Sequence, residues 1–213
     1  MKAIEQIIML ATEQIGIHED MAGHVKYSDE YGAPCRPWCM MFLWWLYRHC
    51  DMSEIFYDGK KIASCGGFLT WAQANGLVVD KPERGDIAII SFGKDKNGKR
   101  ITSHCALITG VKGLNVETIE GNTCEVGDPA NGGHVMARTR SKKLCMAYIR
   151  LRYPADEIGD FIYTVQKGDS LWSLAKRFYG SGQKYPIIKE YNKLKSDTIK
   201  VGQVLKIPAI GGK

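Results

Sequence analysis

The stretch that decides the fold is Pro37-Trp38-Cys39-Met40-Met41-Phe42, which an apolar run continues to Tyr47. Proline suits the first turn of a helix, where its missing N–H costs nothing. The stretch therefore predicts a buried helix with Cys39 in its first turn. Unpaired backbone N–H groups and the positive end of the helix dipole favour a thiolate at that position. Near a histidine such a thiolate is a nucleophile, and without one Cys39 is a packed core residue.

The composition is that of an ordinary folded protein: 213 residues, 45% of them hydrophobic and 24% charged. This length allows one domain of fair size and a second, small one. The seven cysteines are odd in number and form no CxxC pair. Cys35 and Cys39 are four apart, without a second pair of ligands at metal spacing, so we expect neither a zinc site nor a disulfide framework. Reduced thiols fit synthesis in a cytosol.

Residues 1–10 predict an amphipathic helix rather than a signal peptide, because Glu5 and Gln6 interrupt the apolar run. No apolar stretch elsewhere is long enough to span a membrane. We therefore expect synthesis in the cytoplasm and no insertion into a membrane.

The formal net charge of +6 is distributed unevenly along the chain. Residues 1–153 carry +2, residues 154–160 carry −3 and residues 161–213 carry +7. The basic C-terminal part favours a polyanionic partner, namely a nucleic acid, a membrane surface or a cell wall bearing teichoic acid. Its lysines are scattered singly, and it lacks the clustered arginines of a nucleic-acid-binding face. We therefore expect no nucleic-acid partner.

A short segment rich in proline, glycine and acidic residues, 154–160, interrupts every periodic pattern and predicts a linker. It separates a domain of residues 1–153 from one of residues 161–213. In the second domain an alternating strand precedes two helices, which begin at Leu171 and Pro186, and a short strand follows them. Two strands so placed pair with both helices on one face, as a βααβ unit.

The second domain closely resembles a LysM module. The resemblance rests on Tyr163-Thr164-Val165-Gln166-Lys167-Gly168-Asp169-Ser170-Leu171-Trp172-Ser173-Leu174-Ala175, on Asn192 and on Val201-Gly202-Gln203-Val204-Leu205-Lys206-Ile207-Pro208. It implies binding of N-acetylglucosamine in peptidoglycan or chitin, in a groove between the loop before the first helix and the loop after the second. The resemblance implies that the residues in contact with the sugar are Gly168, Asp169, Ser170, Leu171 and Ile199. Local roles are the alternative, because Gly168 permits a turn, Ser170 caps a helix and Leu171 packs.

The first domain changes from helices to strands along the chain. After the Cys39 helix, residues 67–76 predict a core helix, and the strands expected to follow are 87–90, 104–110, 115–122 and 148–153. Helices first and an antiparallel sheet afterwards form an α+β arrangement, which is the order of a papain-like hydrolase.

The expected strands carry the polar residues that a cysteine nucleophile needs. His104 opens one strand, and Glu120 and Asn122 are two apart on the next, which places both on the same face. If the two strands pair, one of these side chains reaches the imidazole, fixes its tautomer and leaves the other ring nitrogen for the thiol. The alternatives are a structural histidine, a solvated strand end at Glu120 and a turn residue at Asn122.

Together these residues resemble the cysteine, histidine-dependent amidohydrolase/peptidase (CHAP) family of papain-like hydrolases. The motifs are Trp38-Cys39-Met40-Met41-Phe42, Gly85-Asp86-Ile87, His104-Cys105-Ala106-Leu107-Ile108 and Ile119-Glu120-Gly121-Asn122. The resemblance implies that Cys39 is the nucleophile and that His104 acts as base and then as acid. It also implies that Glu120 is the orienting carboxylate and that Asn122 is a fourth polar member of the catalytic site.

Three further predictions concern residues near these motifs. Cys105 stands where the family has a small residue, and we expect it to face away from the site. The calcium loop of some relatives is not matched, Asp29 and Glu30 being the nearest acids, so we expect no required metal and no other cofactor. Cys35 is a candidate for a regulatory disulfide with Cys39.

The combined resemblance implies a monomeric peptidoglycan hydrolase of the phage-endolysin type, with the stem peptide in the CHAP domain and N-acetylglucosamine in the LysM module. Made without a signal peptide in the bacterial host cytoplasm, it would act at the cell wall after release. The first candidate activity is N-acetylmuramoyl–L-alanine amidase, and the second is cleavage of a peptide bond in the stem or cross-bridge. The rival interpretations are a wall-binding protein with an inactive papain-like scaffold and an intracellular cysteine protease or transferase.

Overall fold

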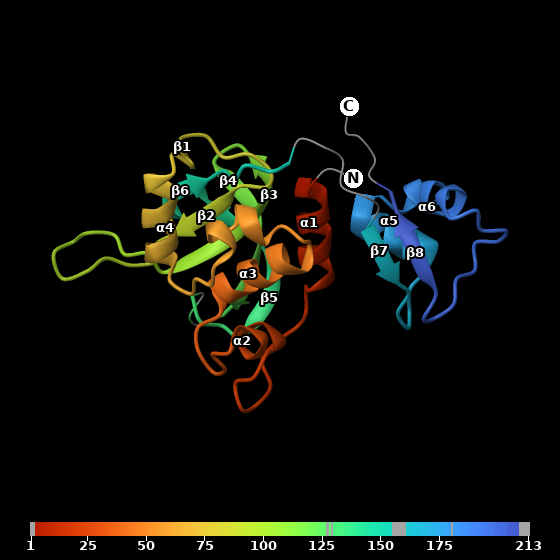
Figure 1. Ribbon diagram of the computed structural model, residues 1–213, viewed down its shortest axis with the longest axis horizontal. Helices are drawn as coiled ribbons and strands as arrows, with labels where there is room; N and C mark the ends of the chain where they lie inside the picture. The colour runs from red at the N-terminus through yellow and green to blue at the C-terminus, as the bar shows by residue number, and fades with distance from the viewer. Residues whose placement is uncertain (1–2, 127, 129, 155–160, 180, 209–213) are drawn as a thin grey trace. The chain divides into compact units, whose positions relative to one another are not determined.

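The computed structural model describes residues 3–126, 128, 130–154, 161–179 and 181–208 (Figure 1). Contacts divide the chain into two compact units, one of Glu13–Tyr153 and one of Met1–Thr12 with Pro154–Lys213. The predicted division into residues 1–153, 154–160 and 161–213 stays a prediction, and its linker lies, except for Pro154, outside the described residues. Among the described residues, no helix combines the length and apolar character that crossing a membrane requires.

The helices come before the main sheet in the chain. They are α1 (Ala3–Glu13), α2 (Lys26–Tyr31), α3 (Cys39–His49) and α4 (Cys65–Ala74), with the short 3-10 turns η1 (Ser53–Ile55) and η2 (Tyr57–Gly59) between the last two. Helix α3 has Cys39 in its first turn as predicted, but it begins there and not at Pro37, which precedes the N-cap Trp38; its residues from Cys39 to Tyr47 are all buried. Helix α4 begins two residues earlier than predicted, because the Ser64 side chain caps it by accepting a hydrogen bond from the Gly67 N–H at 3.0 Å.

The main sheet is antiparallel and has the strand order β1-β6-β2-β3-β4-β5. Its strands are β1 (Val78–Val79), β2 (Ile87–Ile90), β3 (His104–Lys112), β4 (Asn115–Thr123), β5 (His134–Ser141) and, after the 3-10 turn η3 (Lys142–Leu144), β6 (Cys145–Ile149). The predicted α+β class is confirmed. Strands β1 and β5 were not expected, and the last strand is Cys145–Ile149 instead of 148–153.

Helix α3 lies against strands β3 and β4 (Figure 1). The approach is closest at Gly121 of β4, where an added Cβ would lie 2.6 Å from Phe42 Cβ and 2.7 Å from Trp38 Cζ3. Both contacts are shorter than real Cβ atoms show, so this position needs a residue without a side chain. The Glu120-Gly121-Asn122 motif thus brings the start of α3 down onto the sheet.

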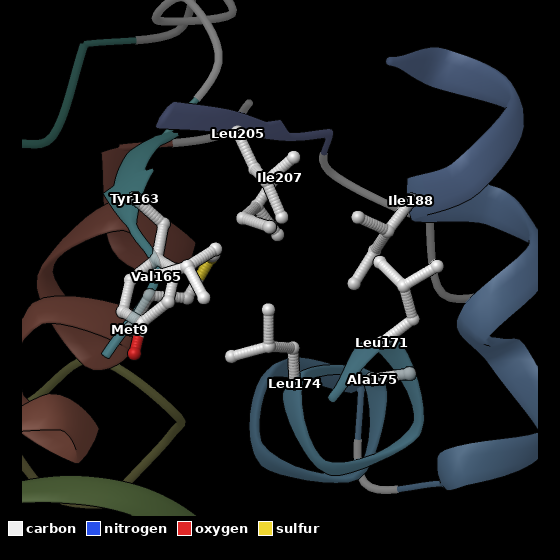
Figure 2. Close-up of a cluster of buried hydrophobic side chains, with 9 residues drawn as sticks. All are labelled: Met9, Tyr163, Val165, Leu171, Leu174, Ala175, Ile188, Leu205 and Ile207. Atoms are coloured by element: carbon white, nitrogen blue, oxygen red, sulfur yellow. The ribbon is translucent and has the colours of Figure 1, made fainter. Parts of the chain in front are cut away.

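The C-terminal part forms the predicted βααβ unit. Its elements are β7 (Phe161–Thr164), α5 (Leu171–Tyr179), the 3-10 turn η4 (Gly182–Lys184), α6 (Tyr185–Tyr191) and β8 (Val204–Ile207). Strands β7 and β8 pair antiparallel, with Tyr163 opposite Leu205. The side chains that converge on its core (Figure 2) are Tyr163, Val165, Leu171, Leu174, Ala175, Ile188, Leu205 and Ile207, joined by Met9 of α1.

We expect Gly121→Ala to destabilise the chain by about 1–3 kcal/mol, because the added methyl group overpacks the contact between α3 and β4. Urea denaturation followed by tryptophan fluorescence measures the loss. The matched control is Gly93→Ala, whose Cβ would meet only ordinary contact at 3.8 Å from Ile101 Cδ1. Equal stability of the Gly121 and Gly93 variants would contradict the close approach.

Candidate active site

Cys39 is the first residue of α3, and its side chain is buried with 5% of the residue exposed. The preceding Trp38 is the N-cap, and its carbonyl accepts the hydrogen bond from the Phe42 N–H at 2.8 Å. The Trp38 indole N–H in turn donates to the Glu19 carboxylate. Two features therefore fix the position of the Cys39 thiol. One is the start of helix α3, and the other is the adjacent Trp38 indole, which Glu19 holds in place.

His104 is the first residue of β3, and Glu120 lies on the neighbouring strand β4. Their side chains are fully buried, with His104 Nε2 at 3.1 Å from Glu120 Oε2. The other ring nitrogen, Nδ1, makes no hydrogen bond among the described residues. Burial lowers the pKa of His104, but Cys39 and Glu120 outweigh it and raise that pKa to about 9. Glu120 thus engages one ring nitrogen, as predicted for one of the two β4 residues, and does not engage Nδ1.

The thiol of Cys39 is acidic for a buried group. Hydrogen bonds from Cys105 and then Cys65 are the main reason that the pKa of Cys39 lies well below its usual range, and His104 adds to their effect against burial. The lowered pKa of Cys39 and the raised pKa of His104 both favour the thiolate–imidazolium form of the pair. In this form a cysteine can attack a carbonyl carbon and a histidine can donate a proton.

A buried network fixes Glu120. Arg140 of β5 donates from Nε to Oε1 at 2.8 Å and from Nη2 to Oε2 at 2.6 Å, and the Thr118 hydroxyl donates to Oε1 at 2.7 Å. Burial raises the pKa of Glu120, but Arg140 and His104 outweigh it and lower that pKa to about 2. Glu120 is therefore a carboxylate. Neither partner of Glu120 was predicted from the sequence. Thr118 could have been found, because it lies two residues before Glu120 on the same predicted strand. Arg140 lies on β5, a strand that was not expected.

Asn122 is placed differently from the prediction. Its φ of +59° and the register shift between Glu120 and Thr123 reverse the alternation of side chains, so Asn122 does not share a face with Glu120. Its amide donates to Asn131 Oδ1 at 2.9 Å and accepts from the Gly133 N–H at 3.2 Å. These contacts fix the ends of the loop before β5, whereas the imidazole is held by Glu120. A catalytic role for Asn122 stays a prediction.

The expectation that Cys105 faces away from the site is wrong. The sulfur atoms of Cys39, Cys65 and Cys105 all lie within 4.8 Å of one another, and those of Cys39 and Cys65 are 3.8 Å apart. Cys105 follows His104 directly in β3, and its sulfur nevertheless lies near the Cys39 thiol at the start of α3. Cys65, the first residue of α4, was not singled out from the sequence.

Cys35 and the acidic residues near it make other contacts. The exposed Cys35 thiol donates to the Ala22 carbonyl at 3.3 Å and is not in a disulfide. Asp29 lies 3.0 Å from His24 Nδ1. Glu30 accepts from the Trp45 indole at 2.7 Å and lies 3.0 Å from His49 Nε2. Both carboxylates are thus engaged with protein groups.

The predicted glycan contacts have local roles in the C-terminal unit. Gly168 adopts φ +93° in the turn, and Ser170 caps α5 by accepting from the Ser173 N–H at 3.0 Å. The Asp169 carboxylate accepts from the Gln166 N–H at 2.8 Å and from Arg177 at 3.1 Å. Leu171 is in the core, and Ile199 packs against it half-buried. Gly168 and Ser170 are exposed, so these two of the five are the most open to a ligand.

Comparisons with known proteins agree with the two motifs. Residues 27–122 match the CHAP domain and residues 163–208 match the LysM domain, which confirms the order of domains predicted from the sequence. Over 54 residues the chain is 43% identical to an uncharacterized protein of Deinococcus radiodurans, covering 25% of this chain and 21% of that protein. Over 45 residues it is 47% identical to the probable peptidoglycan endopeptidase LytE of Bacillus subtilis, covering 21% of this chain and 13% of that protein.

A solved structure, titled "The crystal structure of Ly7917", aligns with 76% of this chain and 69% of its own. The TM-score is 0.41 and the sequence identity is 16%. The chain spans only a small part of the length of the two curated relatives it matches.

We expect Arg140→Met to destabilise the chain by about 3–5 kcal/mol at neutral pH, because the Glu120 carboxylate would stay buried without its partner. Urea denaturation measures the effect. The double variant Glu120→Gln/Arg140→Met should recover part of the loss, since no charge then remains buried at this place.

The pH dependence of this loss identifies Glu120 as its source. A carboxyl whose pKa is lowered from 4.5 to about 2 contributes stability that is present above pH 4.5 and is lost as the pH falls to about 2. The deficit of Arg140→Met is therefore largest above pH 4.5 and shrinks below it. The control is Arg138→Met on the same strand, and a deficit of Arg140→Met that does not change with pH would contradict the assignment.

Proposed function

We propose that this chain is a peptidoglycan hydrolase that cleaves an amide bond through a covalent intermediate on Cys39 and is held at the cell wall by its LysM domain. The observation that carries the proposal is the buried contact between His104 and Glu120, at 3.1 Å, beside an acidic cysteine at the start of α3. The LysM match supplies the reason for a wall substrate, and the relative named as a probable peptidoglycan endopeptidase supports the same substrate class.

The catalytic cycle uses two protons and one water. The Cys39 thiolate attacks the carbonyl carbon of the amide, and backbone N–H groups at the start of α3 stabilise the oxyanion. The His104 imidazolium gives its Nδ1 proton to the leaving nitrogen, so the C–N bond breaks and a thioester remains. Neutral His104 then takes a proton from water, whose hydroxide attacks the thioester and frees the thiolate. Glu120 holds the ring and stabilises its charged form throughout.

Two bonds remain candidates for this cycle. The N-acetylmuramoyl–L-alanine amide is the first, as the resemblance to CHAP amidases implies. The name of the Bacillus subtilis relative favours the second, a peptide bond in the stem or cross-bridge. We propose in addition that the protein is a monomer of the phage-endolysin type, made in the host cytoplasm and active at the wall after release.

One observation favours a second function, a wall-binding protein with an inactive scaffold. Cys39 is only 5% exposed and His104 is fully buried, so a substrate reaches the pair only if the covering residues move. An active enzyme needs such an opening, whereas a scaffold does not. The activity of the full chain therefore decides between the two.

We expect the full chain to reduce the turbidity of Gram-positive wall suspensions, and both Cys39→Ala and His104→Ala to lose this activity at least about a thousandfold. Cys35→Ser, which removes an exposed thiol outside the pair, is the control and should keep it. Mass spectrometry of the digest identifies the bond: intact stem peptides with free muramic lactyl groups mean an amidase, and new amino termini within the stem mean an endopeptidase. Clearing by Cys39→Ala equal to that of the parent chain would disprove the proposed nucleophile.

We expect the Cys39→Ala chain to sediment with purified sacculi and to be displaced by soluble oligomers of N-acetylglucosamine, because the LysM domain, not the thiol, provides the attachment. Glucose oligomers of the same length are the matched competitor and should leave the protein bound. Displacement by neither sugar would exclude N-acetylglucosamine as the ligand of residues 161–213.

A further inference from the structure

Three thiols meet where the proposed reaction uses only one. Cys39 and Cys65 are the first residues of α3 and α4, and Cys105 is the second residue of β3. Their sulfur atoms lie within 4.8 Å of one another, and none of the three is in a disulfide. All three residues are buried, Cys39 at 5%, Cys65 at 8% and Cys105 at 1% exposure. The proposed catalytic cycle forms no bond to Cys65 or Cys105, although both lower the pKa of Cys39.

The spacing of the sulfurs suits one thiophilic metal ion. Sulfur atoms bound tetrahedrally to one zinc at about 2.3 Å lie about 3.8 Å apart. The sulfurs of Cys39 and Cys65 are already 3.8 Å apart. Thiolates select soft or borderline ions such as Zn²⁺, whereas Mg²⁺ and Ca²⁺ take oxygen ligands. The cluster thus resembles the sulfur face of a zinc site in both composition and size.

Two of the three thiols stand where a helix begins. Helices α3 and α4 have 11 and 10 residues, and two of the three thiols stand at their positive ends. A second group lies beside Cys39 of this cluster: His104 is fully buried, Glu120 holds its Nε2, and its Nδ1 is without a hydrogen-bond partner among the described residues. A histidine held by a carboxylate in this way is the usual form of a zinc-binding imidazole.

We propose that Cys39, Cys65 and Cys105 bind one Zn²⁺ ion, with His104 Nδ1 or a water as the fourth ligand, and that the ion blocks the enzyme by occupying its nucleophile. The thiols that are still protonated release their protons to solvent as the three Zn–S bonds form, and the His104 imidazolium releases its Nδ1 proton where Nδ1 is the fourth ligand, so no oxidant or reductant takes part. The proposed binding of Zn²⁺ is inferred from the three thiols alone. The proposed inhibition of the enzyme by Zn²⁺ rests in addition on the proposed function.

The experiment titrates the full reduced chain with Co²⁺ as a spectroscopic probe. Thiolate coordination should give a charge-transfer absorption in the near ultraviolet that saturates at one Co²⁺ per chain and disappears when Zn²⁺ displaces it. Cys65→Ser and Cys105→Ser should each bind Co²⁺ at least about tenfold more weakly. Cys35→Ser and Cys145→Ser are the matched controls and should bind as the parent chain does. An absent band, or a band equal in Cys65→Ser, Cys105→Ser and the parent, would overturn the site.

A stability measurement keeps the test valid if a serine variant does not fold. A ligand that binds only the folded chain raises its thermal midpoint, so Zn²⁺ should raise that of the parent while Mg²⁺ and Ca²⁺ at the same concentration should not. Equal shifts with the three ions would contradict a thiolate site.

Measuring wall clearing with and without Zn²⁺ distinguishes failure of the metal site from failure of the proposed hydrolase function. One equivalent of Zn²⁺ should stop wall clearing by the parent chain, and a chelator should restore it. A Co²⁺ band from a chain that clears no walls leaves the metal site standing and rejects the proposed function. Clearing that Zn²⁺ does not affect, with no Co²⁺ band, rejects the metal site and leaves the hydrolase standing.

Discussion

Two hydrogen bonds from Arg140, of 2.8 and 2.6 Å, hold the Glu120 carboxylate where solvent does not reach. The position of His104 depends on this carboxylate, and the protonation of the imidazole depends on its charge. A neutral Glu120 would leave the ring without an anionic partner, and an unpaired one would carry a large desolvation cost. The ion pair therefore joins three strands, β3, β4 and β5, into one support for the candidate site.

Much of this arrangement is local and was predictable. Pro37 and the apolar run after Cys39 predict the buried helix, because both signals act within a few residues. The pairing of His104 with Glu120 followed from strand alternation, once adjacent strands were assumed. The same rule misplaced Asn122, because its left-handed backbone reverses the alternation within one residue. Arg140 was out of reach for another reason: its role is set by the register of β5 on β4, which the side-chain pattern alone does not determine.

The cluster of Cys39, Cys65 and Cys105 could not be predicted from the sequence for a third reason. Cys39, Cys65 and Cys105 are far apart in sequence, and no spacing rule brings them together, so the sequence pattern argued against a metal site. They meet because two helix starts converge on one strand. The neighbouring thiols and His104 all lower the pKa of Cys39, so acidity at this site is a product of packing as well as of the imidazole.

The contrast between the exposed Cys35 and the covered Cys39 has a consequence for chemical labelling. Cys35 holds an open loop position at φ +58°, whereas Cys39 lies beneath its neighbours. A bulky maleimide will modify Cys35 long before it reaches Cys39, so the stoichiometry of such a reagent reports surface thiols and not buried ones. Small, fast electrophiles are the appropriate probes, and the ratio of the two labelling rates measures how often the covering residues open.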